Sequence, residues 1–141
     1  MNKKTLIIST IVTALAAAVG TLLVKSLMGD DAALTVDKML LQAANETNKT
    51  LPMMVDRDTR LDATVAGPGN RFTYSYTLVN YSKQNVDIPS LKKYLQPRLL
   101  ANYKSHDQMK SFRENHVDLN YEYKDKDGVF LFAVIVSPKD F

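Results

Sequence analysis

The sequence predicts an α+β protein in which an N-terminal transmembrane helix precedes a four-stranded antiparallel sheet with helices packed on one face. Three observations predict it. A segment of 20 residues near the N-terminus carries no charge, two pairs of segments alternate apolar and polar residues around a turn, and the segments before and between these pairs repeat apolar residues at helical spacing. With 141 residues and no cysteine, the chain has the size of one domain that is stabilised by packing.

Residues 5–24 form the predicted membrane anchor. At about 1.5 Å per residue, such a helix spans the roughly 30 Å hydrocarbon core of a bilayer. Residues 1–4 are then a cytoplasmic tip, 25–33 a linker and 34–141 an extracytoplasmic α+β domain. A cleaved signal peptide is the alternative, because residues 14–16 (Ala-Leu-Ala) resemble a cleavage site, although the apolar run continues beyond them. Both interpretations export the domain.

Basic residues are concentrated beside the predicted anchor. Lys3 and Lys4 precede it, and Lys25 follows it and is itself followed by Asp30 and Asp31. The positive-inside rule then places the N-terminus in the cytoplasm and the domain in the periplasm or outside, with the anchor in a bacterial inner membrane. Removing these three lysines from the 18 Lys and Arg residues leaves 15, against 15 Asp and Glu. A neutral domain lacks the basic footprint that phosphates require, so no nucleic-acid partner is expected.

The first helix of the domain is predicted to end near Asn48, with Asp30 and Asp31 as possible caps. Its apolar residues recur every three or four positions, as expected for one buried face; they are Val36, Met39, Leu40, Ala43 and Ala44. Pro52 then pushes the preceding Leu51 out of the helical region and starts an extended stretch.

The two pairs of alternating segments predict two antiparallel hairpins. In the first, residues 61–65 and 72–78 alternate on either side of a Gly-Pro-Gly-Asn turn. In the second, residues 117–123 alternate before a turn at 125–128. Residues 129–136 are an unbroken apolar run, which is typical of an interior strand with both faces covered.

Residues 87–115, between the hairpins, have a helical pattern with Ser90 as the expected cap. Pro97 removes one helical hydrogen bond, so a kink or two short helices are expected. Residues 105–108 have the spacing of a capping box, which predicts the start of a last helix that carries Met109 and Phe112.

The sequence contains none of the common catalytic or nucleotide-binding motifs. His106 and His116 have no acidic partner at ligand spacing. Asp56, Asp58 and Asp62 alternate as in a calcium loop, but an arginine occupies one ligand position, and the glycine and closing glutamate of such a loop are missing. The sequence therefore predicts local Asp/Arg pairing, with no metal and no cofactor.

Two features remain as candidate contact surfaces. The predicted broken helix is locally basic, which would suit an acidic protein or an anionic membrane surface; the alternative is that these charges form only the solvated face of the helix. Seven tyrosines without a tryptophan are expected to face the core mostly, and an exposed subset would favour an interface. The candidate partner-binding residues are Lys92, Lys93, Arg98, Lys104, Lys110 and Arg113.

Residues 51–78 (LPMMVDRDTRLDATVAGPGNRFTYSYTL) resemble small exported or membrane-anchored bacterial proteins of unassigned function. The stretch carries no catalytic signature. The resemblance implies a bacterial source and an extracytoplasmic domain, and it transfers no functional residues.

Three hypotheses for the function follow. The preferred one is a non-enzymatic, membrane-tethered periplasmic domain that binds a protein, such as an envelope accessory subunit or an immunity or exclusion factor. The first alternative is a periplasmic carrier of a small molecule or lipid, in which the tyrosine-lined sheet and the helices enclose a pocket. The second is a hydrolase that uses Asp56, Asp58 and Asp62 as acid and base.

Overall fold

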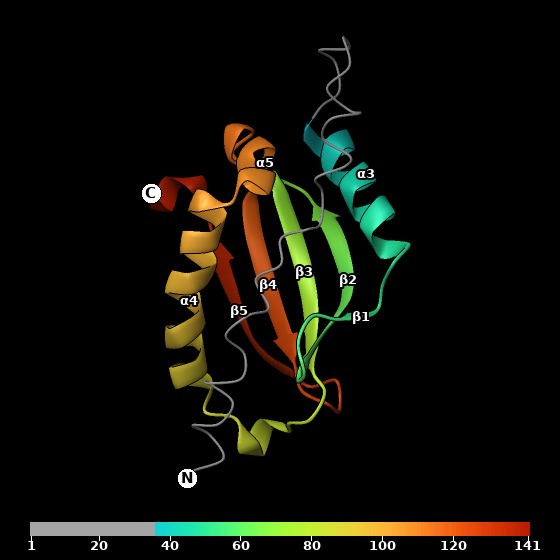
Figure 1. Cartoon of the computed structure of the whole chain (residues 1–141), viewed down its shortest axis with the longest axis vertical. Helices are drawn as coiled ribbons and strands as arrows, with labels where there is room; N and C mark the ends of the chain where they lie inside the picture. Colours follow the sequence, from blue (N-terminus) through green and yellow to red (C-terminus); the bar gives the residue numbers. More distant parts are fainter. Residues whose placement is uncertain (1–35) are drawn as a thin grey trace.

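A computed structural model describes residues 36–141 of the chain (Figure 1). The predicted anchor at residues 5–24, the linker at 25–33 and the predicted caps Asp30 and Asp31 lie outside these residues. Within the described part of the chain, no helix combines the length and the apolar composition that crossing a membrane requires.

Helix α3 (Val36–Asn48) ends where the sequence predicts and packs over strand β2 (Thr59–Gly67). The side chain of Asn48, at the end of the helix, donates to the Thr64 carbonyl at 2.9 Å and accepts from the Thr64 amide at 2.8 Å. Asn48 thus satisfies backbone groups on the outer side of β2. The buried residues of α3 are Met39, Leu40, Ala43 and Ala44, as its apolar spacing predicts.

The sheet has five strands in the order β1-β2-β3-β4-β5, not the predicted four. The extra strand, β1 (Met53–Met54), is a two-residue edge strand that pairs with β2. Both predicted hairpins form: β2 pairs antiparallel with β3 (Arg71–Leu78), and β4 (Asp118–Lys124) pairs antiparallel with β5 (Phe130–Val136).

The prediction of a purely antiparallel sheet is wrong, because β3 and β4 are parallel neighbours. The chain between them contains helix α4 (Ile88–Ser105), which returns along the sheet so that β4 starts at the same end as β3. A helical crossover of this kind is the usual connection between parallel strands. The pairing of the two hairpins therefore follows from the helix that joins them.

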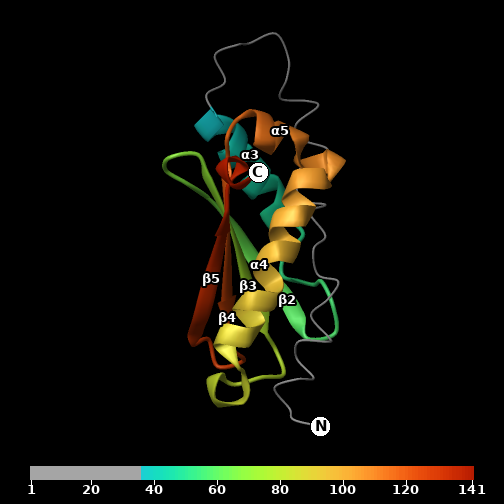
Figure 2. The ribbon, with the colours of Figure 1, turned by 90° about the vertical axis from the view of Figure 1, so that its left-hand side faces the viewer.

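Helices α3 and α4 lie on the same side of the sheet, as predicted, with α3 over β2 and α4 over β5 (Figures 1 and 2). Helix α4 is one continuous helix despite Pro97, so of the two predicted outcomes the division into two short helices is absent. Pro97 is exposed, and the helical hydrogen bond that it removes therefore lies on the solvent side, where water can satisfy the free carbonyl.

The two predicted helix caps differ from the observed ones. The N-cap of α4 is Asp87, whose carboxylate accepts from the amide of Ser90 at 3.3 Å. At the other end the Ser105 hydroxyl donates to the Ala101 carbonyl instead of starting a capping box. His106 caps the following 3-10 turn, Asp107–Met109, which leads into helix α5 (Lys110–Glu114). The buried residues after this break are Met109 and Phe112, as predicted.

Side chains from β3, β4 and β5 meet in rows on the helical side of the sheet. Tyr74 is in register with Tyr121, and Tyr121 with Val134. The next row is Tyr76, Tyr123 and Phe132, and the row on the other side is Phe72, Leu119 and Val136. All nine side chains are buried, so this face of the sheet is the core.

Strand β5 lies at an edge of the sheet, so the prediction of an interior strand is wrong. Its apolar run combines two environments. Phe132, Val134 and Val136 belong to the core, whereas Ile135, on the opposite face, is 45% exposed and Phe130 is 55% exposed. An unbroken apolar run in the sequence shows that the side chains are apolar, but it does not show whether each one is buried in the fold.

Candidate protein-binding surface

Helix α4 carries four basic residues and no acidic one. Lys93 and Lys104 are eleven positions apart, about three helical turns, so they share one side of the helix. The buried side is occupied by leucines and Tyr103, which pack on the sheet, and the basic side chains are exposed. The exposed basic residues of α4 are Lys92, Lys93, Arg98 and Lys104.

Two of these basic side chains lie on aromatic rings. The guanidinium carbon of Arg98 is 3.6 Å from the centroid of the Tyr94 ring, and Arg98 Nη1 also donates to the Tyr94 carbonyl at 3.0 Å. The Lys104 ammonium is 5.9 Å from the centroid of the Phe141 ring. These contacts hold the two charges near the helix surface.

Lys110 and Arg113, the other two candidates, lie on α5. The Lys110 ammonium is 3.6 Å from the Glu114 carboxylate in an exposed pair. Arg113 donates through Nη1 to the carbonyls of Tyr103 at 2.8 Å and His106 at 2.7 Å. Arg113 thus joins α5 to the end of α4, which is a structural role. The structure therefore brings four of the six predicted residues together on one helix.

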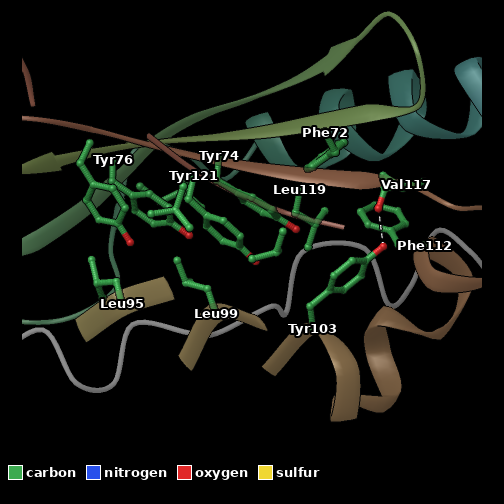
Figure 3. Close-up of a cluster of buried hydrophobic side chains, with 14 of the residues drawn as sticks. Phe72, Tyr74, Tyr76, Leu95, Leu99, Tyr103, Phe112, Val117, Leu119 and Tyr121 are labelled. Atoms are coloured by element: carbon green, nitrogen blue, oxygen red, sulfur yellow. Dashed lines mark hydrogen bonds between the residues drawn. The ribbon is translucent and has the colours of Figure 1, made fainter. Parts of the chain in front are cut away.

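The tyrosines of β3 and β4 form a stacked array in the core, together with Phe132. Figure 3 shows Tyr74, Tyr76 and Tyr121 of this array. The rings of Tyr74 and Tyr121 are 5.1 Å apart, as are those of Tyr76 and Tyr123. Burial raises the pKa of each of these four hydroxyls well above its ordinary value. The prediction that most tyrosines face the core is confirmed, and this array is not an exposed contact surface.

Tyr103 connects α4 to the start of β4. Its hydroxyl donates to the Val117 carbonyl at 2.5 Å, and its side chain is fully buried (Figure 3). Burial raises the pKa of the Tyr103 hydroxyl, although the nearby Arg113 guanidinium lowers it in part. The basic helix is therefore fixed to the sheet by a buried hydrogen bond as well as by leucine packing.

The three aspartates of the hydrolase hypothesis have separate structural contacts. Asp56 Oδ1 accepts from the amides of Asp58 and Thr59, at 2.8 and 2.7 Å. Asp58 Oδ1 accepts from the Asn80 amide group at 2.7 Å. Asp62 is paired with its neighbour Arg60 at 2.5 Å, as local Asp/Arg pairing predicts. Within residues 36–141, no group of three or more acidic, histidine or cysteine side chains could hold a metal ion.

Asp125 organises the turn between β4 and β5. Its carboxylate accepts from the amides of Asp127 and Val129 and, across the chain, from the amide of Lys83, each at 2.9 Å. Burial opposes the charged form, but these hydrogen bonds and the nearby Lys126 outweigh it and lower the pKa of Asp125. The turn chemistry that the sequence suggests therefore accounts for this residue.

Sequence patterns alone missed two features of the surface. The contact of Arg98 with Tyr94 has an i,i+4 spacing, which is a usable signal once the helix is known to continue through Pro97. The open edge at β5 has no local signal, because strand order is a property of the whole sheet.

Three solved structures share this fold. A presumed secreted protein (PA3611) from Pseudomonas aeruginosa has a TM-score of 0.61 at 15% identity, over 72% of this chain and 88% of that one. The type II secretion pilotin AspS from Vibrio cholerae has a TM-score of 0.56 at 8% identity, over 75% and 92%. The type 2 secretion pilotin EpsS from Vibrio vulnificus has a TM-score of 0.57 at 9% identity, over 74% and 89%. At these identities the likeness is one of fold.

Among curated protein sequences, none matches this chain. One family does match, over residues 35–132, which is most of the chain and nearly all of the described domain. The chain therefore belongs to the family described as Domain of unknown function (DUF8479).

Proposed function

We propose that this protein is a non-enzymatic accessory protein of the bacterial envelope, tethered by its N-terminal segment, whose domain binds a protein partner outside the cytoplasm. One observation carries the proposal: α4 presents four exposed basic side chains and no acidic residue, whereas the rest of the described domain has 11 Lys and Arg against 13 Asp and Glu. A surface of this kind attracts an acidic protein and orients it during encounter.

The proteins that share the fold support this proposal. Two of them are pilotins of type II secretion systems, and the third is a presumed secreted protein. The fold is therefore found in accessory components of protein export. The predicted anchor at residues 5–24 and the charges around it support a position of the domain outside the cytoplasm.

The contacts of the aspartates favour a binding protein over a hydrolase. A pair of catalytic carboxylates must face a common point where the substrate lies. Asp56 closes a local turn, Asp58 holds Asn80, and Asp62 pairs with Arg60. The three carboxylates thus have different hydrogen-bond partners, and none of these contacts joins two of the carboxylates.

The test is in-cell crosslinking followed by affinity purification of the full-length protein from its native membrane. We expect one stoichiometric envelope protein in the wild-type eluate. The double variant Lys92→Glu, Lys93→Glu should reduce its recovery by about ten-fold or more, because reversal of two exposed charges on α4 makes them repel an acidic partner.

The matched control is Lys38→Glu, Lys49→Glu, which makes the same charge change on exposed residues of α3 and the turn after it. This control should recover the partner at the wild-type level. Equal loss in both double variants would mean that net charge, and not α4, governs recovery. No partner with any variant would refute the proposed function.

A further inference from the structure

Within residues 36–141, strand β5 lies at an edge of the sheet. Among the described strands it pairs with β4 alone, and none of its seven residues is charged or proline. Exposed edge strands offer free N–H and C=O groups to any extended chain, so folded proteins usually blunt them with charges, proline or short length. Figure 2 looks onto this edge and shows α4 to one side of β5.

The hydrogen-bond pattern identifies which residues of β5 point outward. The amide of Asp118 donates to the Asn70 carbonyl, so the backbone of Asp118 faces β3. The backbone N–H and C=O groups of successive residues point to opposite sides of a strand, so those of Leu119, Tyr121 and Tyr123 point toward β5. Their partners in register are Val136, Val134 and Phe132, whose backbones therefore face β4. The residues between them, Ala133 and Ile135, direct an N–H and a C=O each away from the sheet.

The opposite edge of the sheet is partly covered. Strand β1 covers the start of β2 with two residues only, and the side chain of Asn48 binds both backbone groups of Thr64 farther along. At the end of β5, the amide of Ser137 is occupied by the Asp140 carboxylate at 2.9 Å. The open stretch is thus confined to Ala133 and Ile135, between a bulge near Leu131 and the C-terminal turn.

The surroundings of this edge define the chemistry of an added strand. On the face away from the helices, Ile135 is 45% exposed, so an apolar side chain beside it would remove apolar surface from water. On the other face α4 packs against β5 and carries Lys92, Lys93, Arg98 and Lys104 without any acidic residue. An extended segment with alternating apolar and acidic side chains complements both faces, because alternate residues of a strand point to opposite sides.

We propose that β5 is a docking site for an extended segment of the partner protein, with alternating apolar and acidic side chains, which adds to the sheet as a sixth strand. The inference rests on the proposed function and specifies how the partner is held. Backbone hydrogen bonds to Ala133 and Ile135 supply the binding, and the basic residues of α4 select acidic segments.

A second copy of the chain is a poorer occupant. Antiparallel pairing of two β5 strands around a two-fold axis keeps both copies of α4 on the same side of the combined sheet. The two basic helices then approach each other, and like charges disfavour the pairing. An acidic segment is attracted by the basic residues of α4, whereas the same residues of a second copy would be repelled.

The test uses the full-length protein in detergent and two synthetic peptides, a heptapeptide of alternating Glu and Val and its Lys/Val counterpart. We expect the Glu/Val peptide to bind and the Lys/Val peptide to bind at least about ten-fold more weakly. Amide hydrogen exchange followed by NMR should show new protection at Ala133 and Ile135. Binding of neither peptide at millimolar concentration, or protection at other residues, would overturn the proposal.

The decisive variant is Ile135→Pro, which removes an outward N–H while leaving the bonds to β4 in place. This variant should bind the Glu/Val peptide about ten-fold more weakly, as expected for one or two lost hydrogen bonds. Ile135→Val keeps the amide and should bind the peptide like the wild type. If Ile135→Pro does not fold, Ile135→Glu places a repulsive charge at the same exposed position. Unchanged binding by the folded edge variant would refute strand addition.

The remaining outcomes separate this inference from the proposed function. Protection of Ala133 and Ile135 without peptide, together with a dimer in light scattering, would assign the edge to a second copy and overturn the proposed occupant. If the envelope partner is captured equally by the wild type and Ile135→Pro, strand addition fails and the proposed function stands. If no partner is captured but the peptide protects β5, the proposed function fails instead.

Discussion

The Arg113 side chain holds two segments of the chain together at the end of α4. The carbonyl of Tyr103 lies in the last turn of that helix, where carbonyls have no helical partner. Arg113 supplies a donor for it and a second donor for the His106 carbonyl, which also accepts from the Met109 amide at 2.9 Å. A residue that local composition assigns to a basic surface is therefore part of the fold, and its charge strengthens the two hydrogen bonds.

Replacing Arg113 should cost more stability than replacing its exposed neighbour. We expect Arg113→Ala to lower the free energy of unfolding by about 1–3 kcal/mol, because two backbone carbonyls lose a charged donor. Lys110→Ala, which removes an exposed ion pair on the same short helix, should cost no more than about 0.5 kcal/mol. Urea denaturation measures both. Equal losses in the two variants would contradict the structural role of Arg113.

At the scale of the element, α4 remains one helix because its proline lies on the solvent side. Pro97 removes the hydrogen bond to the Lys93 carbonyl, but Leu95 and Leu99 on either side of it stay buried against the sheet. Packing of a buried leucine contributes about 1.5–3 kcal/mol, and several leucines together outweigh one lost helical bond. Local propensity predicts a break that tertiary packing prevents.

Pro97 should therefore destabilise α4, and replacing it should stabilise the protein. Pro97→Ala restores the hydrogen bond to Lys93, although alanine also gives the unfolded chain more freedom. The net effect should be a gain of about 1–2 kcal/mol in the free energy of unfolding. Gln96→Ala, at the exposed neighbouring position, serves as the control and should change stability by less than about 0.5 kcal/mol. Thermal and urea unfolding measure the free energy of unfolding of both variants. A lower value for Pro97→Ala than for the wild type would refute the prediction.

At the scale of the whole molecule, the tyrosine array joins the two hairpins across the parallel β3–β4 pair. Tyr74 and Tyr76 come from the first hairpin, and Tyr121 and Tyr123 from the second. Burial raises the pKa of all four hydroxyls, so the fold favours their protonated form. The unfolded chain ionises near the ordinary tyrosine pKa of about 10. The free energy of unfolding therefore keeps its full value at pH values below this pKa and falls as the pH rises above it.

The variant Tyr121→Phe should make this alkaline loss shallower. Removing one ionisable hydroxyl reduces the slope by at most about 1.4 kcal/mol per pH unit above pH 10. The free energy of unfolding, measured in urea between pH 8 and pH 11 for the wild type and the variant, gives both slopes. Parallel curves above pH 10 would mean that Tyr121 ionises equally well in the folded and unfolded states.

The sequence by itself determined the positions of α3 and of the two hairpins in the described domain. Apolar spacing located α3 and its buried residues, and period-two alternation around glycine-rich turns located both hairpins. It also indicated the exposed basic residues of α4, since a helix with a leucine stripe leaves its charged residues in water. These features depend on the chain geometry of a few neighbouring residues, which the sequence encodes directly.

Only the tertiary structure decided how these elements combine. The parallel pairing of β3 with β4 depends on the path of α4, and the position of β5 at an edge depends on the order of all five strands. For that reason the same apolar run is compatible with an interior strand and with an open edge. The role of Arg113 was hidden in the same way, because its two carbonyl partners approach it only when α5 folds back on the end of α4. Contacts between distant residues arise from the packing of whole elements, and no local pattern records them.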